Sequence, residues 1–174
     1  MKKNIFILLS ACILIPFKAF PGGPGDYAPV IKQQANAMGY ALMKNDYKTY
    51  LKYTDPRVIK TMGGADAFID TLKHFEAQRK HYGASFFQID VEEPAWVIDS
   101  AGELQTTVPV TTQMRVKGGL VTSTTTMIGL SKDKGKNWVF MDTAEGIKSI
   151  RNKYKDISSR LSVPVPPAPK FQSN

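Results

Sequence analysis

The chain has 174 residues, of which 43% are hydrophobic and 22% charged, with a formal net charge of +8 at pH 7 and one cysteine, Cys12. This length is enough for one ordinary hydrophobic core. The basic residues form no stripe interleaved with aromatic residues, so the composition argues against nucleic acid as a partner.

Residues 1–20 have the layout of a secretory signal peptide. Lys2 and Lys3 precede an apolar run over residues 5–17, which Lys18 follows. The run is shorter than the roughly twenty residues that a membrane-spanning helix needs. We therefore expect this segment to be removed on export, leaving a periplasmic or secreted protein with residues 21–26 as a flexible leader. Its net charge of about +5 favours anionic surfaces without specifying one.

The leader also allows lipoprotein processing. Residues 9–12, Leu-Ser-Ala-Cys, resemble a bacterial lipobox, in which Cys12 would carry a lipid and hold the protein at a membrane. Against this, residues 13–17 are apolar where a polar tether is expected. If the cut instead follows Ala19, the mature chain has no cysteine, which excludes disulfides and thiolate catalysis.

Two amphipathic helices are predicted first. Between residues 27 and 44 the apolar positions recur at intervals of four, three and four, as one face of a helix requires: Ile31, Ala35, Met38 and Leu42. Asp46 is placed to cap a second, shorter helix, which Asp55-Pro56 ends. The inward face of that helix is Tyr47, Tyr50, Leu51 and Thr54.

Residues 57–62 are short and partly β-branched, which predicts a strand or an extended link. A third helix is predicted over residues 65–82, with Gly83 as its C-terminal cap. Its apolar side carries Phe68, Ile69, Leu72, Phe75 and Tyr82. Since each helix has one apolar face, we expect all three to pack on a common partner, the β-rich stretch from residue 85 to residue 142.

That stretch predicts two short strands and then a long hairpin. The inward residues of the first strand are Phe87, Ile89 and Val91. A second strand begins at residues 96–98 and turns at 99–102, and two long strands meet across Gly118-Gly119. The first long strand has Leu104, Thr106, Val108, Val110, Thr112, Met114 and Val116 on one face, and Gln105, Gln113 and Arg115 on the other. We expect only the first face to be core, and Pro109 to mark a bulge or an edge position.

A last hairpin is predicted at residues 133–136, returning through Trp138, Phe140 and Asp142. Residues 131–138 fit S-x-D-x-G-x-x-W and resemble the Asp-box of sialidases. We interpret this box as a structural turn, in which Asp133 accepts from turn amides, Gly135 takes a positive φ and Trp138 packs beneath the hairpin. Glycoside chemistry would need a carboxylate pair in a cleft, and the pattern indicates none.

A C-terminal helix is predicted from the spacing of Ile147, Ile150, Tyr154, Ile157 and Leu161. Lys148, Arg151 and Lys155 would share one face of it, either as a solvated surface or as a contact with an anionic membrane. Residues 163–174 are rich in proline, which predicts an extended tail or spacer, with a P-x-x-P docking motif as the alternative.

The predicted order, helices first and a curled antiparallel sheet after them, gives one α+β domain over residues 27–162. Residues 45–51 leading to Asp55-Pro56, the helix start at Gly63-Gly64 and the closing segment 135–142 resemble the SnoaL-like, nuclear-transport-factor-like superfamily. The resemblance implies a cone-shaped, cystatin-like roll with a pocket at its wide end, to which the C-terminal helix is an addition. The superfamily includes isomerases, dehydratases, cyclases and members that only bind or assemble, so it implies no single reaction.

Asp142 is the main candidate for chemistry. With Tyr53 it could act as a general base in an apolar pocket, or it could cap the C-terminal helix with Glu145 three residues on. Tyr40, Met114 and Trp138 are candidates for ligand binding. His74 and His81 lie two helical turns apart, about 10 Å, too far to chelate one ion. We expect neither a metal nor a cofactor.

We therefore expect an exported, non-catalytic domain that binds a small apolar ligand or a protein partner. The alternatives are a cofactor-free isomerase, dehydratase or cyclase that uses Asp142 and Tyr53, and attachment to anionic surfaces through the basic C-terminal helix. Homo-oligomerisation stays open.

Overall fold

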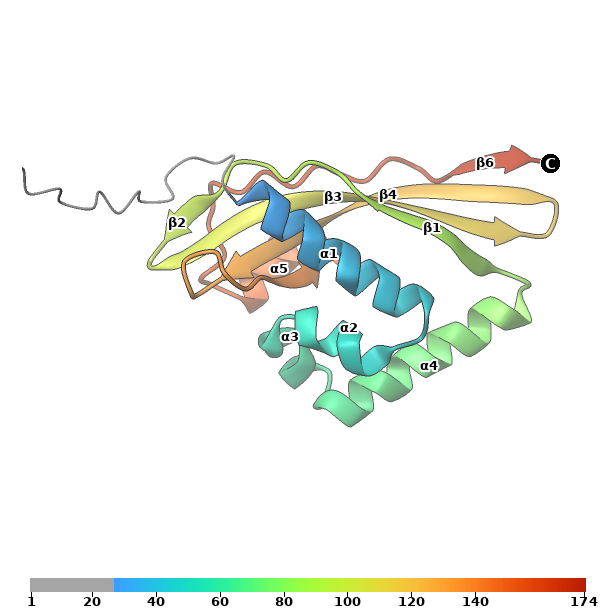
Figure 1. Cartoon of the computed structure of the whole chain (residues 1–174), viewed down its shortest axis with the longest axis horizontal. Helices are drawn as coiled ribbons and strands as arrows, with labels where there is room; N and C mark the ends of the chain where they lie inside the picture. Colours follow the sequence, from blue (N-terminus) through green and yellow to red (C-terminus); the bar gives the residue numbers. More distant parts are fainter. Residues whose placement is uncertain (1–26) are drawn as a thin grey trace, which may run out of the picture.

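A computed structural model describes residues 27–174, so the predictions for the leader, Cys12 included, lie outside the described residues. Figure 1 shows an α+β arrangement in which helices precede an open antiparallel sheet. The helices are α1 (Ala28–Met43), α2 (Tyr47–Tyr53), α3 (Pro56–Thr61), α4 (Ala65–His81) and α5 (Ile147–Lys153). The strands are β1 (Ser85–Val91), β2 (Ile98–Ser100), β3 (Glu103–Val116), β4 (Gly119–Ser131), β5 (Val139–Asp142) and β6 (Lys170–Ser173).

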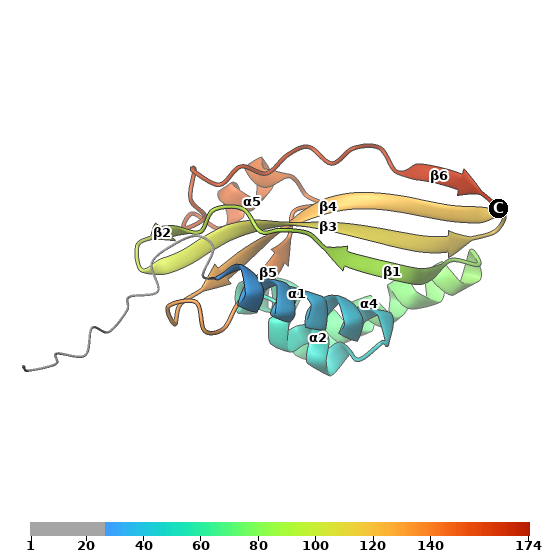
Figure 2. The ribbon, with the colours of Figure 1, turned by 45° about the horizontal axis from the view of Figure 1, so that its top comes forward.

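The two long strands β3 and β4 form the centre of the sheet, as the hairpin pattern predicted. Within residues 27–174 the sheet has six strands, and all of their pairings are antiparallel. β1 and β2 pair with different parts of β3, on the side away from β4. In the same way, β5 and β6 pair with different parts of β4, on the side away from β3 (Figure 2). Pro109 pairs with Thr126 without a register shift and lies where β1 ends, so its missing N–H costs the ladder nothing.

Both faces of the sheet are core, which corrects the expectation of one buried face. On one face α1 covers a cluster of Ile31, Ala35, Met38, Val108, Trp138 and Phe140. On the other, α5 and the chain after it cover Ile128, Leu130, Met141, Ile150, Ile157 and Leu161. Because side chains alternate along a strand, Phe140 and Met141 enter different clusters. Gln105, predicted to face outward, is fully buried on the α5 side.

The prediction of a strand or link at residues 57–62 was wrong, because this segment is the helix α3. The Asp55 carboxylate accepts a hydrogen bond from the Arg57 N–H at 2.7 Å, and Pro56 occupies the first turn with its φ already fixed. The same Asp-Pro pair that ends α2 therefore begins a new helix.

The helix α4 does not pack on the sheet as expected. It contacts α2 and α3, none of its residues is fully buried, and Phe75 is 51% exposed (Figure 1). The strand that follows also departs from simple alternation. A bulge between Phe86 and Gln88 shifts the pattern by one residue, so Phe87 is 45% exposed while Phe86 packs against Arg79.

The predicted C-terminal helix is shorter than its periodicity indicated, since α5 ends at Lys153. Ile157 and Leu161 are buried as predicted, but in turns rather than in a helix. Side chains satisfy the backbone hydrogen-bonding groups of this segment. The Arg151 guanidinium donates to the carbonyls of Ser158, Ser159 and Leu161. The Gln105 amide donates to the Asp156 carbonyl and accepts from the Ser158 N–H.

The proline-rich tail is more than a solvated spacer, because its last residues return to the sheet. Residues 162–169 run without regular structure, and β6 then pairs with Gly119–Thr122 of β4 (Figure 2). Gly119 is required at this point, since the Gln172 carbonyl lies where a Cβ of residue 119 would be.

No helix within residues 27–174 combines the length and the apolar character needed to cross a membrane.

Candidate functional site

A narrow apolar slot lies between α1 and the sheet. We call it the helix–sheet slot. Four of its lining residues come from α1: Ala35, Met38, Gly39 and Leu42. The other lining residues come from α2 and the strands: Tyr50, Ile89, Val91, Val110, Thr112, Thr125, Met127 and Asp142. Its volume is about 90 Å³. Gly39 lets α1 approach the sheet, because a Cβ at this position would lie only 3.0 Å from Cγ2 of Ile89.

Four polar side chains open into this apolar slot: Tyr50, Thr112, Thr125 and Asp142. The Asp142 carboxylate accepts a hydrogen bond from the Ala144 N–H. Among residues 27–174, no partner hydrogen-bonds to the hydroxyls of Tyr50, Thr112 or Thr125. The slot therefore has unused hydrogen-bonding capacity against apolar walls.

The surroundings change the acidity of two of these groups. Burial raises the pKa of Asp142, although solvent still reaches the carboxylate, and the hydrogen bond from Ala144 opposes part of the rise. Burial, and then the negative charge of Asp142, raise the pKa of Tyr50 to about 12. Near neutral pH the slot thus holds a protonated Tyr50 beside a carboxylate that is more basic than a solvated aspartate.

Of the predicted site residues, only Asp142 lines the slot. Tyr53 packs against the core cluster that α1 covers and does not line the slot. Tyr50, one turn earlier on α2, lies beside Asp142 in the position that was predicted for Tyr53. Tyr40 is 64% exposed, Met114 is half-buried nearer the hairpin end, and Trp138 is buried in the core. The structure does not bring these three together.

The helix-cap interpretation of Asp142 was wrong. The N-cap of α5 is Gly146, and Glu145 interacts instead with Ser149 and Lys153. Asp142 caps the local turn before the helix, which leaves the carboxylate in the slot.

The structural interpretation of the Asp-box is confirmed. The Asp133 carboxylate accepts hydrogen bonds from the backbone and the amide of Asn137 and from the Ser131 hydroxyl, and these bonds lower its pKa. Gly135 has a φ of +83°, and the buried Trp138 indole donates to the Gly135 carbonyl at 3.0 Å. The box is thus a structural turn beneath which Trp138 packs, and Gln34 of α1 ties it to the helix by accepting from the Trp138 N–H and donating to the Lys136 carbonyl.

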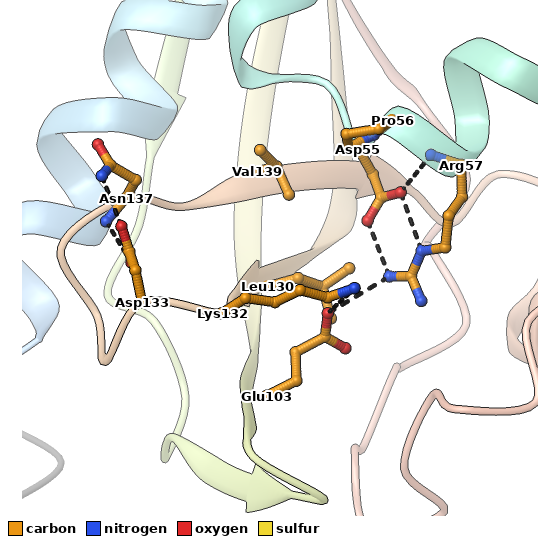
Figure 3. A pocket seen from close by; sticks show the side chains of 9 residues that line it. All are labelled: Asp55, Pro56, Arg57, Glu103, Leu130, Lys132, Asp133, Asn137 and Val139. Atoms are coloured by element: carbon orange, nitrogen blue, oxygen red, sulfur yellow. Dashed lines mark hydrogen bonds and ion pairs between the residues drawn. The ribbon is translucent and has the colours of Figure 1, made fainter.

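A second hollow, of about 330 Å³, lies on the opposite face of β4 and β5 (Figure 3). We call it the Glu103 cleft; it is lined by Asp55, Pro56, Arg57, Glu103, Leu130, Lys132, Asp133, Asn137 and Val139. Glu103 and Lys132 meet because the start of β3 pairs with the end of β4. Asp55 is brought there by its backbone N–H, which donates to the Phe140 carbonyl at 2.9 Å.

Arg57 lies among three carboxylates, those of Asp55, Glu103 and Asp156, at the Glu103 cleft. Its Nε and Nη2 donate to the Asp55 carboxylate at 3.0 and 2.8 Å, and its Nη1 contacts Asp156. The bonds to Asp55 raise the pKa of Arg57 further above its ordinary range. Sequence reasoning missed this cluster because it treated residues 57–62 as a link. The Asp-Pro helix start was the signal available.

The basic face predicted on the C-terminal helix is not assembled. Arg151 turns inward to three backbone carbonyls, Lys153 pairs with Glu145 at 3.1 Å, and Lys155 lies beyond the end of α5. Of the three residues predicted to form this face, Lys148 and Lys155 are exposed and Arg151 is not.

In the part of the chain that the structure describes, no group of three His, Cys, Asp or Glu side chains is placed to hold a metal ion. His74 and His81 are both exposed on α4.

No family model, curated protein or solved structure matches this chain.

Proposed function

We propose that this is an exported binding domain whose helix–sheet slot holds a slender, mostly apolar molecule bearing one hydrogen-bonding group. The observation that carries the proposal is the set of three hydroxyls without hydrogen-bond partners among residues 27–174, beside the Asp142 carboxylate, on otherwise apolar walls. Sites for small molecules combine apolar walls with a few convergent polar groups in this way.

The size of the slot limits the ligand. Pockets for drug-sized molecules enclose about 300 Å³ or more, whereas the slot encloses about 90 Å³. A single small ring or the end of an aliphatic chain fits this space. A hydroxyl on it would donate to Asp142 or bond to one of the slot hydroxyls of Tyr50, Thr112 and Thr125, and a carbonyl would accept from one of those hydroxyls. The apolar part would contact Val110 and Met127.

The fold is proposed to be the cone-shaped, cystatin-like roll of the SnoaL-like superfamily. The order of helices and strands, the long β3–β4 hairpin and the position of the slot between α1 and the sheet support this assignment. Export is proposed on the pattern of residues 1–20.

A second candidate, a cofactor-free isomerase, dehydratase or cyclase, is favoured by one observation: a carboxylate of raised pKa shares the slot with a protonated tyrosine. Asp142 would take a proton from carbon, and Tyr50 would donate a hydrogen bond to the oxygen on which charge develops. Binding is preferred because the slot is small and offers a single carboxylate.

The binding proposal can be tested with phenol, a one-ring probe with one hydroxyl, by following methyl signals in NMR spectra. We expect saturable shifts at Ile89, Val110 and Met127. Replacing the slot hydroxyls in the double variant Thr112→Val/Thr125→Val should weaken binding by about two- to tenfold for each hydroxyl that phenol uses.

A matched control lies on the same two strands. Thr111 and Thr124 are directly paired and bond to each other at 3.1 Å, one residue along each strand from the slot pair. Thr111→Val/Thr124→Val should leave phenol binding unchanged. Shifts that do not saturate, or that respond equally to both double variants, would rule out the slot as the site.

A further inference from the structure

The Glu103 carboxylate is buried but incompletely paired. Its side chain is 9% exposed, and Oε2 accepts a hydrogen bond from Gln105 at 3.0 Å. Oε1 has no hydrogen bond within residues 27–174: its nearest cations are Arg57 Nη2 at 3.9 Å and Lys132 Nζ at 3.7 Å. Both distances exceed a hydrogen bond. One oxygen of a largely buried carboxylate thus opens into the hollow with capacity for one more donor.

Neither neighbouring cation is set to fill this capacity. Each nitrogen of the Arg57 guanidinium already bonds to Asp55 or Asp156, and Nη2, at 3.9 Å, lies too far from Oε1 of Glu103 to donate its second hydrogen. The side chain of Lys132 is 76% exposed and reaches across the cleft from the end of β4 (Figure 3). Because the ammonium of Lys132 is solvated and the contact is longer than a hydrogen bond, this pair is of the weak kind that contributes about 1 kcal/mol or less. A better-placed donor can therefore displace Lys132 at little cost.

The charges around Arg57 leave a negative surplus. Three carboxylates, on Asp55, Glu103 and Asp156, surround two cations, Arg57 and Lys132. A ligand with one positive charge would neutralise this group, whereas an anionic ligand would add to the surplus. The floor of the cleft is apolar, with Leu130 and Val139 from neighbouring strands. The volume of about 330 Å³ leaves room for several carbon atoms beside the charged group.

We propose that the Glu103 cleft binds a primary ammonium group carried on a short aliphatic chain. The ammonium donates to Oε1 of Glu103, and the chain lies on Leu130 and Val139. This site is independent of the helix–sheet slot, because the two hollows open on opposite faces of β4 and β5. Either site can therefore fail its test without affecting the other.

Three probes of equal length separate charge from hydrophobic contact: pentylammonium, pentanol and pentanoate. Each is titrated into the full-length protein while the methyl signals of Leu130 and Val139 are followed by NMR. We expect saturable shifts with pentylammonium, weaker binding of pentanol and the weakest binding of pentanoate. Equal binding of the three, or tightest binding of pentanoate, would overturn the proposal.

Two variants are expected to act in opposite directions. Glu103→Gln keeps the shape of the side chain but removes its charge, and should weaken pentylammonium binding about tenfold or more. Lys132→Met removes the competing cation and should strengthen binding several-fold. Lys136→Met, an exposed lysine in the same turn, is the matched control and should change nothing.

The Lys132→Met result keeps the test decisive even if Glu103→Gln is poorly folded. Weaker pentylammonium binding in Lys132→Met would contradict the proposal, because it would make Lys132 part of the site rather than a competitor for Glu103. Unchanged binding in a well-folded Glu103→Gln variant would contradict it as well.

Discussion

The helix–sheet slot and the Glu103 cleft use the same two strands, β4 and β5, from opposite faces. The slot has apolar walls and neutral hydroxyls around one carboxylate, and it is small. The cleft is larger and carries two buried carboxylates, of which Asp55 is held by Arg57 and Glu103 is not. The comparison shows how alternation along one short strand, with Val139 on one face and Asp142 on the other, supplies two chemically different surfaces. If the two faces are independent, a substitution on one face should leave ligand binding on the other unchanged.

The largest effects are expected from neighbouring residues of β5 that enter different cores. Phe140→Ala should lower the free energy of unfolding by about 3–5 kcal/mol and Met141→Ala by about 2–5 kcal/mol, because both side chains are almost fully buried. Urea denaturation measures both. A loss well below 1 kcal/mol for Met141→Ala would mean that the α5 side is not a second core. Lys136→Ala, at an exposed position, should stay within about 0.5 kcal/mol of the parent protein.

Arg57→Ala should cost about 3 kcal/mol, because it leaves the buried Asp55 carboxylate without its charged partner. Arg57→Lys should recover only part of this loss, since an ammonium cannot reproduce the two parallel bonds to Asp55. Phenol binding to the helix–sheet slot should survive both changes. If slot binding is lost while the protein stays folded, the two faces are coupled.

Deleting residues 170–174 should cost less than about 1 kcal/mol, since the side chains of β6 are all exposed and only backbone pairing is lost. The deletion uncovers the edge of β4, so self-association should rise with protein concentration, as light scattering can detect. Gly119→Ala should mimic the deletion by displacing the Gln172 carbonyl. Ligand binding at either hollow should not change.

Asp142→Asn should have the smallest effect, and the size of this effect should depend on pH. Burial raises the pKa of Asp142 above the ordinary value of 3.8 in the folded protein. The folded state therefore binds more protons than the unfolded chain as pH rises above about 3.8, and the parent protein loses stability until the folded pKa is passed. The asparagine variant lacks this loss.

Thermal melts of both proteins from acidic to neutral pH measure the difference. The melting temperature of Asp142→Asn, relative to that of the parent protein, should increase as pH rises through this window. A difference that is flat or runs the other way would show that the pKa of Asp142 is not raised. If the domain is instead an enzyme, turnover should be lost in this variant while the protein stays folded.

Local patterns were sufficient for several elements. The spacing of Ile31, Ala35 and Met38 predicted α1 and its buried face, and Asp46 was correctly assigned as the cap of α2. In the turn from Asp133 to Trp138, the acceptor role of Asp133, the positive φ of Gly135 and the packing of Trp138 were predicted, because the donors to Asp133 lie within a few residues of it. For Asp142 the sequence left two roles open, a pocket residue or a helix cap, and the structure places it in the lining of the slot.

The misses share a different cause. The bulge at Phe86 to Gln88 depends on how β1 pairs with β3, and the chain after α5 bonds through Asp156 and Ser158 to Gln105, about fifty residues away. The Glu103 cleft joins side chains from α3, from the start of β3 and from the end of β4, which no short window contains together. Tyr53 was named as the partner of Asp142, although the predicted inward face of α2 contained Tyr50 and not Tyr53, and it is Tyr50 that lines the slot.

What the amino-acid sequence alone determined is the set of elements whose stabilising contacts are local: amphipathic helices, the long hairpin and the Asp-box turn. Tertiary structure decided that both faces of the sheet are covered and which charged groups meet across Arg57. It also decided that β6 returns to the edge of β4. The physical reason is that periodicity tells which side of an element is apolar, whereas the partner that buries this side depends on packing between segments far apart in the chain.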